Sequence, residues 1–131
     1  SFIWKGTSPN LEWGISVCQD DETYGAGKYV IQSLVRGINC DLVVDYSDVS
    51  KWFQIAFVLS GNDLKLNVNG ALVDSQIGIP SASRTNQDIF LGGSNHPVSG
   101  AYNRDLDEVY IYNRALSADE VKALYEFERA N

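Results

Sequence analysis

Short segments that alternate apolar and polar residues, separated by turn residues, constrain the fold of this chain more than any other feature. They include "SFIWKG", "LEWGISVC", "KYVIQSLVRG", "INCDLVVDY", "KWFQIAFVL", "LKLNV", "ALVDSQIG" and "DIFLGG". A period of two is typical of strands that bury one face. Asn69-Gly70 predicts a tight hairpin, since both central residues of a type I′ turn have positive φ. The spacing predicts an all-β protein, a two-sheet antiparallel β-sandwich of the jelly-roll kind.

The stretch "LDEVYIYNRALSADEVKALY", residues 106–125, changes its period halfway. Its first half alternates as a strand does, with Asp107 on the same side as Val109 and Ile111. After Ser117 the apolar spacing is helical, and Ser117 with Glu120 forms the S-x-x-E pattern of a capping box. We expect a short C-terminal helix whose apolar stripe lies against a face or edge of the sandwich. That stripe consists of Val121, Leu124 and Tyr125.

The length and charge of the chain limit its function. With 131 residues, the chain is expected to form one domain, 1–131. A net charge of −7 without a basic patch disfavours nucleic acid as a partner. No apolar run reaches the roughly 20 residues of a membrane helix, so membrane insertion is not expected. Acidic character suits a calcium-binding surface, and it equally serves solubility.

Two cysteines are present, Cys18 and Cys40. Cys18 is out of phase with the apolar residues of its segment, whereas Cys40 is in phase with Ile38 and Leu42. If both segments belong to one sheet, the thiols point to opposite faces and cannot form a disulfide. We therefore predict two reduced thiols, which indicate no particular compartment.

Three stretches resemble the laminin-G-like or concanavalin A-like lectin/glucanase jelly rolls. They are "KWFQIAFVLSGNDLKLNVNGALVDS", "DIFLGGSN" and the closing "LDEVYIYNRALSADEVKALY". The last is similar to a closing signature of the form (I/L)-D-E-V-x-I-Y-N-R-A-L-S-x-x-E, and it is the most specific of the three. The resemblance covers residues 51–125, whereas the first fifty residues match only loosely. It implies a lectin-like fold and favours an extracellular or cell-surface location.

The resemblance also implies that the chain is shortened at its N-terminus. Relatives carry further strands ahead of the segment that "SFIWKG" matches, and these strands pair with the closing strand. Either another segment or a second copy of the chain supplies them, or the sandwich is smaller with a protected edge. An open edge offers unpaired backbone groups, so a homo-oligomer is one expectation.

Catalysis is not expected. Glycoside hydrolases of this fold carry E-x-D-x-(x)-E on one strand, and the nearest match here is Asp105 with Asp107, followed on that face by Val109. The single histidine, His96, belongs to no metal or nucleophile pattern.

Asp107 raises a separate question, because an aspartate among Val109 and Ile111 is costly unless something satisfies it. In the family, the matching aspartate either ligates a structural calcium or accepts hydrogen bonds from backbone amides. Calcium needs six to eight oxygen ligands, some of which the N-terminal strands supply in relatives. Both alternatives stay open, so Asp107 is a candidate metal ligand and Ca²⁺ a possible cofactor.

Two loops contain candidate ligand-binding residues, since binding sites often lie on loops of rigid β scaffolds. The loop "QDDETYGAG" offers carboxylates for a cation or sugar hydroxyls and an aromatic ring for stacking. The loop "GGSNHPVSGAYN" offers uncharged donors and acceptors. The candidates are Asp20, Asp21, Tyr24, Asn95, His96, Tyr102 and Asn103. Solvated surface loops are the alternative reading of both segments.

The tryptophans are expected to differ in role. Trp52 occupies the position of the family's usual tryptophan and is expected in the core, as is Trp13, while Trp4 is undecided. An exposed ring on a concave sheet face would provide a surface on which a sugar can stack.

Together these observations predict a non-catalytic lectin-like module that binds carbohydrate. The alternative is a protein-interaction or assembly domain that pairs through an open sheet edge, and glycosidase activity is a more distant third. A carbohydrate or a protein surface is therefore the expected partner.

Overall fold

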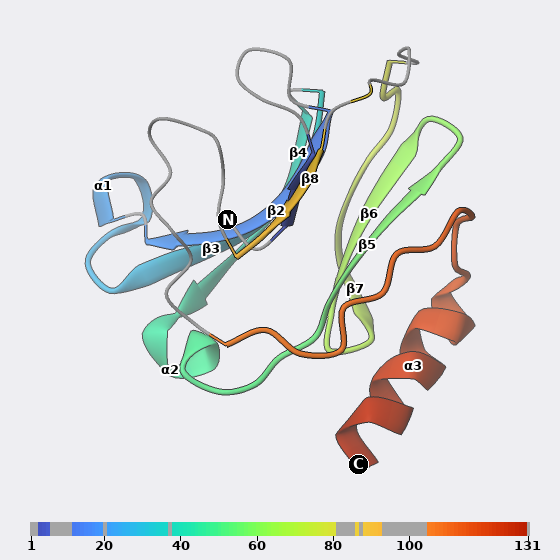
Figure 1. Ribbon diagram of the computed structural model, residues 1–131. Coiled ribbons are helices and arrows are strands. Elements are labelled where there is room, and N and C mark those ends of the chain that lie inside the picture. Colours follow the sequence, from blue (N-terminus) through green and yellow to red (C-terminus); the bar gives the residue numbers. More distant parts are fainter. Residues whose placement is uncertain are drawn as a thin grey trace.

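The computed structural model of this protein is a sandwich of two antiparallel β-sheets with a helix on its outside (Figure 1). It describes residues 3–5, 12–19, 21–36, 38–80, 86, 88–92 and 105–130. The five-stranded sheet has the order β4 (Ile38–Asp45), β3 (Lys28–Val35), β2 (Trp13–Gln19), β1 (Ile3–Lys5) and β8 (Ile89–Leu91). The three-stranded sheet has the order β5 (Ile55–Ser60), β6 (Asp63–Val68) and β7 (Ala71–Gln76). The helices are α1 (Asp21–Tyr24), α2 (Tyr46–Val49) and α3 (Ala118–Ala130).

The core lies between the two sheets and follows the alternation of the sequence. Alternate residues of β3 and β4 point inward, and alternate residues of β6 meet them from the other sheet. The buried cluster consists of Ile31, Val35, Cys40, Leu64, Leu66 and Ile79. Trp13 and Phe53 are among the partly buried side chains that pack against it. The predicted sandwich is therefore confirmed.

The five-stranded sheet curves so that its outer face, turned away from β5–β7, is concave (Figure 1). On that face Ser16, Gln32 and Asp41 lie side by side on β2, β3 and β4. The Gln32 side-chain amide donates to the Asp41 carboxylate at 3.0 Å. This polar row is half-buried.

A β-bulge helps to join the two sheets. The register between β6 and β7 shifts after Leu66, so that Leu66 pairs with Asp74 and Asn67 with Leu72. Val73 is the extra residue on β7, and it packs against the core. Beyond it, the Asp74 carboxylate accepts a hydrogen bond from the Asp41 backbone amide on the edge strand β4, at 2.9 Å.

The predicted hairpin and helix are both present. Asn69 and Gly70 have φ of 51° and 77°, as a type I′ turn requires. Helix α3 lies along the outer face of the three-stranded sheet (Figure 1), where Val121 is buried and Tyr125 packs against Gly70. At its far end, the Gln54 side-chain amide donates to Glu128 at 2.8 Å.

The prediction for the cysteines is confirmed, since neither forms a disulfide. Cys18 is exposed and Cys40 is buried, on opposite faces of the same sheet. Burial raises the pKa of the Cys40 thiol to about 11, and the nearby Asp74 and Asp41 add to the effect.

Two predictions about individual segments are wrong. Trp52 is 71% exposed, because β5 begins only at Ile55 and Phe53 takes the core position instead. Residues 105–112 do not join either sheet, and their side chains are exposed. Glu108 has a φ of 49°, which interrupts an extended conformation, and the described strands offer this segment no ladder partner.

Candidate functional site

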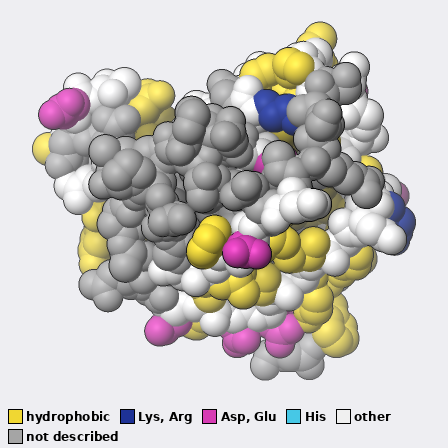
Figure 2. All heavy atoms as spheres, turned by 45° about the horizontal axis from the view of Figure 1, so that its top comes forward, with side chains coloured by type: hydrophobic (Ala, Val, Ile, Leu, Met, Phe, Trp, Pro, Cys, Tyr) yellow, Lys and Arg dark blue, Asp and Glu magenta, His cyan; other side chains and the backbone are white. Residues whose placement is uncertain are grey.

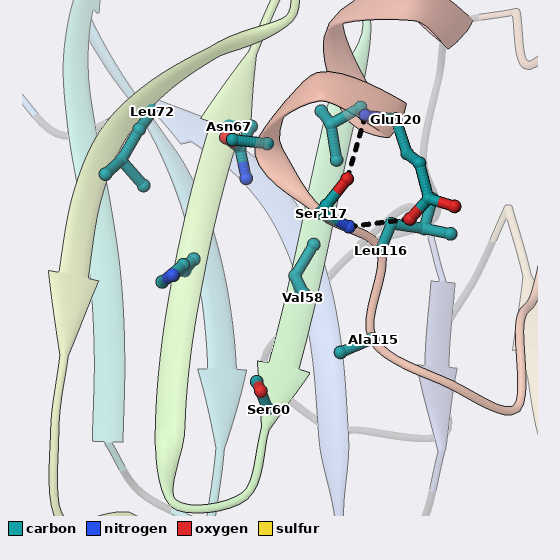
Figure 3. A pocket seen from close by; sticks show the side chains of 11 residues that line it. Val58, Ser60, Asn67, Leu72, Ala115, Leu116, Ser117 and Glu120 are labelled. Atoms are coloured by element: carbon teal, nitrogen blue, oxygen red, sulfur yellow. Dashed lines mark hydrogen bonds between the residues drawn. The ribbon is translucent and has the colours of Figure 1, made fainter.

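A pocket of about 340 Å³ lies between the outer face of the three-stranded sheet and the start of α3 (Figure 3). We call it the α3 pocket. The sheet supplies Val58, Ser60, Lys65, Asn67 and Leu72, and the other wall is formed by Ala115, Leu116, Ser117, Ala118, Glu120 and Val121. Ligand sites for small molecules begin at about this volume.

The sheet side of the α3 pocket follows from strand alternation. Leu64 and Leu66 of β6 point into the core, so Lys65 and Asn67 point outward toward α3. On the neighbouring strands, Val58 of β5 pairs with Lys65, and Leu72 of β7 pairs with Asn67. The floor of the pocket thus combines aliphatic and polar side chains.

Asn67 is the most unusual side chain of this pocket. It is only 5% exposed, yet its carboxamide makes no hydrogen bond within the part of the chain that the structure describes. Among the described residues, the fully enclosed side-chain atoms without a partner are Ser33 Oγ, Arg36 Nε and Gln54 Oε1, so the Asn67 amide atoms still open into the α3 pocket. An amide that opens into a pocket without a partner from the described residues offers both a donor and an acceptor to water or to a ligand.

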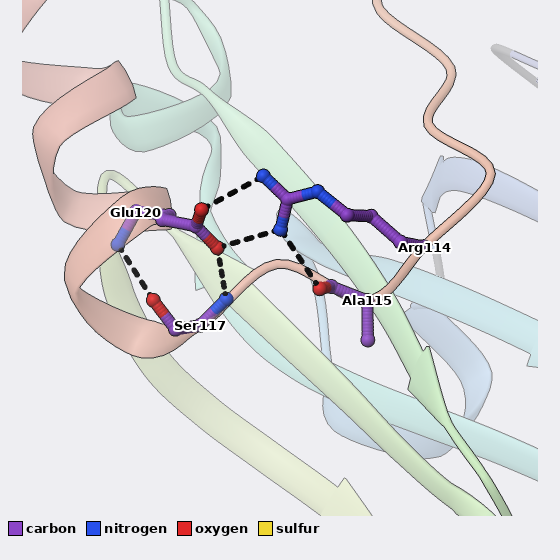
Figure 4. A network of polar contacts seen from close by, with 4 residues as sticks. All are labelled: Arg114, Ala115, Ser117 and Glu120. Carbon is purple, nitrogen blue, oxygen red and sulfur yellow. Dashed lines mark hydrogen bonds and ion pairs between the residues drawn. The ribbon is translucent and has the colours of Figure 1, made fainter.

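The opposite wall is fixed by a polar network at the start of α3 (Figure 4). The Glu120 amide donates to the Ser117 hydroxyl at 3.1 Å, and the Ser117 amide donates to the Glu120 carboxylate at 2.8 Å. This is the predicted capping box. The Arg114 guanidinium donates to both oxygens of the same carboxylate, at 2.8 and 2.9 Å. The hydrogen bond from Arg114, followed by the one from Ser117, lowers the pKa of Glu120 to about 2.

The residues predicted from the first loop lie far from the α3 pocket along the fold. Asp21 opens α1 and Tyr24 closes it, at the tip between β2 and β3, where the Tyr24 side chain is 44% exposed. Asp20 lies outside the described residues. The four candidates of the second loop, Asn95, His96, Tyr102 and Asn103, also lie outside them.

Asp107 is exposed rather than buried among apolar side chains, which removes the cost that the sequence pattern suggested. Its carboxylate accepts a hydrogen bond from the Glu108 amide at 2.9 Å. Within the described part of the chain, no group of three His, Cys, Asp or Glu side chains could hold a metal ion. Figure 2 shows acidic side chains at separate points among hydrophobic ones on the face that it presents.

The residues of the α3 pocket were not recognised as a site from the sequence. The available signal was "LKLNV", in which an amide and an ammonium alternate with buried leucines beneath an amphipathic helix. Since outward-facing polar residues on a strand are ordinarily solvated, only the position of α3 over this face distinguishes Asn67 from a surface residue.

This architecture, two antiparallel sheets with a concave outer face, is that of a lectin-type β-sandwich. Residues 9–122 match the concanavalin A-like lectin/glucanases superfamily, and the chain belongs to this family. No curated protein sequence matches it.

Among solved structures, the chain is similar to an S-layer domain-containing protein (residues 221–444) from Clostridium thermocellum. The two are 19% identical, with a TM-score of 0.49, over 87% of this chain and 63% of that one. This chain therefore spans less than two thirds of the length of that structure. None of the described helices is long and apolar enough to cross a membrane.

Proposed function

We propose that this domain is a non-catalytic carbohydrate-binding module whose ligand occupies the α3 pocket. The observation that supports the proposal is Asn67, a buried carboxamide that lines the pocket without a partner from the protein. A carboxamide both donates and accepts hydrogen bonds, as vicinal sugar hydroxyls require. The lectin-type family to which the chain belongs is consistent with such a ligand.

The rest of the pocket complements a sugar ring. Ser60 adds a hydroxyl at the other end of the pocket from Asn67 (Figure 3), and among the described residues neither side chain has a hydrogen-bond partner. Val58 and Leu72 supply aliphatic surface against which the C–H face of a ring can pack. The volume of the α3 pocket fits a short saccharide or the end of a longer glycan. A glycan-binding role would place the domain outside the cell or at its surface.

Binding without hydrolysis is proposed because the described residues of the pocket do not include a pair of carboxylates. Glycosidases use two, about 5 to 10 Å apart. Glu120 is the one carboxylate among the described residues that line the α3 pocket, and it accepts hydrogen bonds from Arg114 and Ser117. A carboxyl group whose pKa is about 2 cannot serve as a general acid near neutral pH.

Affinity electrophoresis in gels that contain single polysaccharides tests the proposal. Asn67→Ala removes the amide without adding bulk, and Gln32→Ala is a matched control on the concave face. We expect at least one polysaccharide to retard the wild type and Gln32→Ala but not Asn67→Ala. Retardation by none, or its loss only in Gln32→Ala, would contradict this site.

A second candidate function, assembly through an open edge, is favoured by residues 105–112. Five large apolar side chains of this segment are 40–60% exposed: Leu106, Val109, Tyr110, Ile111 and Tyr112. Glu108 has positive φ within it, a strain that an extended, paired conformation would relieve. Light scattering at increasing protein concentration tests this candidate. A dimer that Ile111→Lys abolishes would support it, whereas a monomer at all concentrations would contradict it.

A further inference from the structure

We infer that the α3 pocket selects acidic saccharides, such as those that contain uronic acids, over neutral ones. This inference rests on the proposed carbohydrate function and specifies its ligand. It starts from Lys65, the one cationic side chain that the described part of the chain contributes to the pocket lining.

Lys65 has no anionic partner among the described residues. It lies in the middle of β6, opposite Val58 on β5 and Ser75 on β7, neither of which is charged. Asp63 is two residues away on the same face, but it does not line the pocket and forms no ion pair with Lys65. Other lysines do have partners, as Lys28 does with Asp45 at 2.6 Å. The ammonium group of Lys65 is therefore available to a ligand.

The carboxylate of Glu120 does not cancel this charge. Both of its oxygens accept hydrogen bonds from Arg114, and one also accepts the Ser117 amide (Figure 4). The bidentate pair neutralises Glu120 and fixes its orientation. The described lining of the pocket therefore presents one uncompensated positive charge, in a protein whose net charge is −7.

An acidic oligosaccharide would satisfy all three polar groups along the pocket. A carboxylate would accept hydrogen bonds from the Lys65 ammonium, and hydroxyls of neighbouring sugar units would bond to Asn67 at one end and Ser60 at the other. Hydrogen bonds to charged groups are about twice as strong as those between neutral groups. Each neutral sugar would leave the ammonium without a counter-charge.

Isothermal titration with pairs of oligosaccharides tests the inference. Each uronic-acid oligosaccharide is compared with its carboxyl-reduced form, which is neutral and otherwise the same. The variants are Lys65→Gln, which keeps length and hydrogen bonding but removes the charge, and Lys51→Gln, an exposed lysine outside the pocket.

We expect the wild type and Lys51→Gln to bind at least one acidic form about tenfold or more tightly than its neutral counterpart. Lys65→Gln should bind the two forms equally. Equal binding by the wild type would overturn the inference and leave the carbohydrate function standing. Binding of neither form in any pair would overturn both.

Arg114 is a positioning residue in this scheme, and a second set of variants tests that role. Arg114→Gln leaves the negative charge of Glu120 uncompensated in the pocket wall, so the preference for the acidic form should fall. The double variant Arg114→Gln with Glu120→Gln should regain it, since no competing carboxylate remains. A double variant that stays as unselective as Arg114→Gln would contradict the role of charge.

Discussion

Asn67 and Leu72 lie opposite each other on the outer face of the three-stranded sheet, because the register shift after Leu66 pairs them across β6 and β7. This pairing sets a polar and an aliphatic side chain next to each other in the floor of the α3 pocket (Figure 3). The bulge residue Val73 thus packs against the core, and the register shift that it causes places Leu72 beside Asn67.

Leu72→Ala is expected to weaken saccharide binding while leaving the fold almost unchanged. The Leu72 side chain is 56% exposed, so its loss should change the free energy of unfolding by less than about 1 kcal/mol. Urea unfolding and affinity electrophoresis measure the two effects separately. Ile77→Ala, at a position 81% exposed and outside the pocket, is the control and should keep full binding.

Gly70→Ala should destabilise the protein more than Gly61→Ala. Both residues have positive φ, 77° and 59°, so each alanine costs about 1 kcal/mol of conformational strain. A Cβ at position 70 would also lie 3.0 Å from Cδ1 of Tyr125, whereas position 61 has open space. The difference between the two midpoints in urea therefore reports on the packing of α3. Equal decreases in the free energy of unfolding would show that Tyr125 does not pack closely against Gly70.

Acid should weaken the attachment of α3 through Glu120. Its folded pKa, about 2, lies below its ordinary value of 4.5, so the stabilisation is present above pH 4.5 and is lost as the pH falls toward 2. Thermal melting between pH 6 and pH 2 should show a steeper decline for the wild type than for Glu120→Gln. Parallel curves would mean that the Arg114 pair does not stabilise the fold.

The strands were predictable from the sequence because each carries its own signal. Alternation placed Leu64 and Leu66 inside, and Asn69-Gly70 marked the hairpin. The capping box of Ser117 and Glu120 needs only local geometry, so it too was readable.

The features that the sequence did not predict correctly depend on contacts between distant parts of the chain. The alternation of residues 106–112 indicates a strand, but a strand forms only where a neighbour accepts its hydrogen bonds. The role of Trp52 depended on where β5 begins, which alternation alone does not fix. The α3 pocket forms only when the helix lies over β5–β7, so Asn67 and Lys65 could not be distinguished from surface residues in the sequence.

The calcium prediction for Asp107 can be tested by thermal melting with excess Ca²⁺ and with a chelator. A ligand at about 100 times its Kd stabilises the folded state by about 2.7 kcal/mol. If Asp107 ligates calcium, the wild type should melt at a higher temperature with Ca²⁺, and Asp107→Asn should not. Identical melting curves for the wild type under both conditions would contradict a calcium site.

The central claim is that the Asn67 amide is kept without a protein partner for the sake of a ligand, and urea unfolding of Asn67→Leu tests it most directly. Leucine has a similar shape and needs no hydrogen bond, so the free energy of unfolding should rise by about 1 kcal/mol. Asn39→Leu, at an exposed position of β4, controls for added apolar surface and should show no such gain. A loss of stability in Asn67→Leu would mean that the amide already has its partner within the fold, and the α3 pocket would lose its claim to be a binding site.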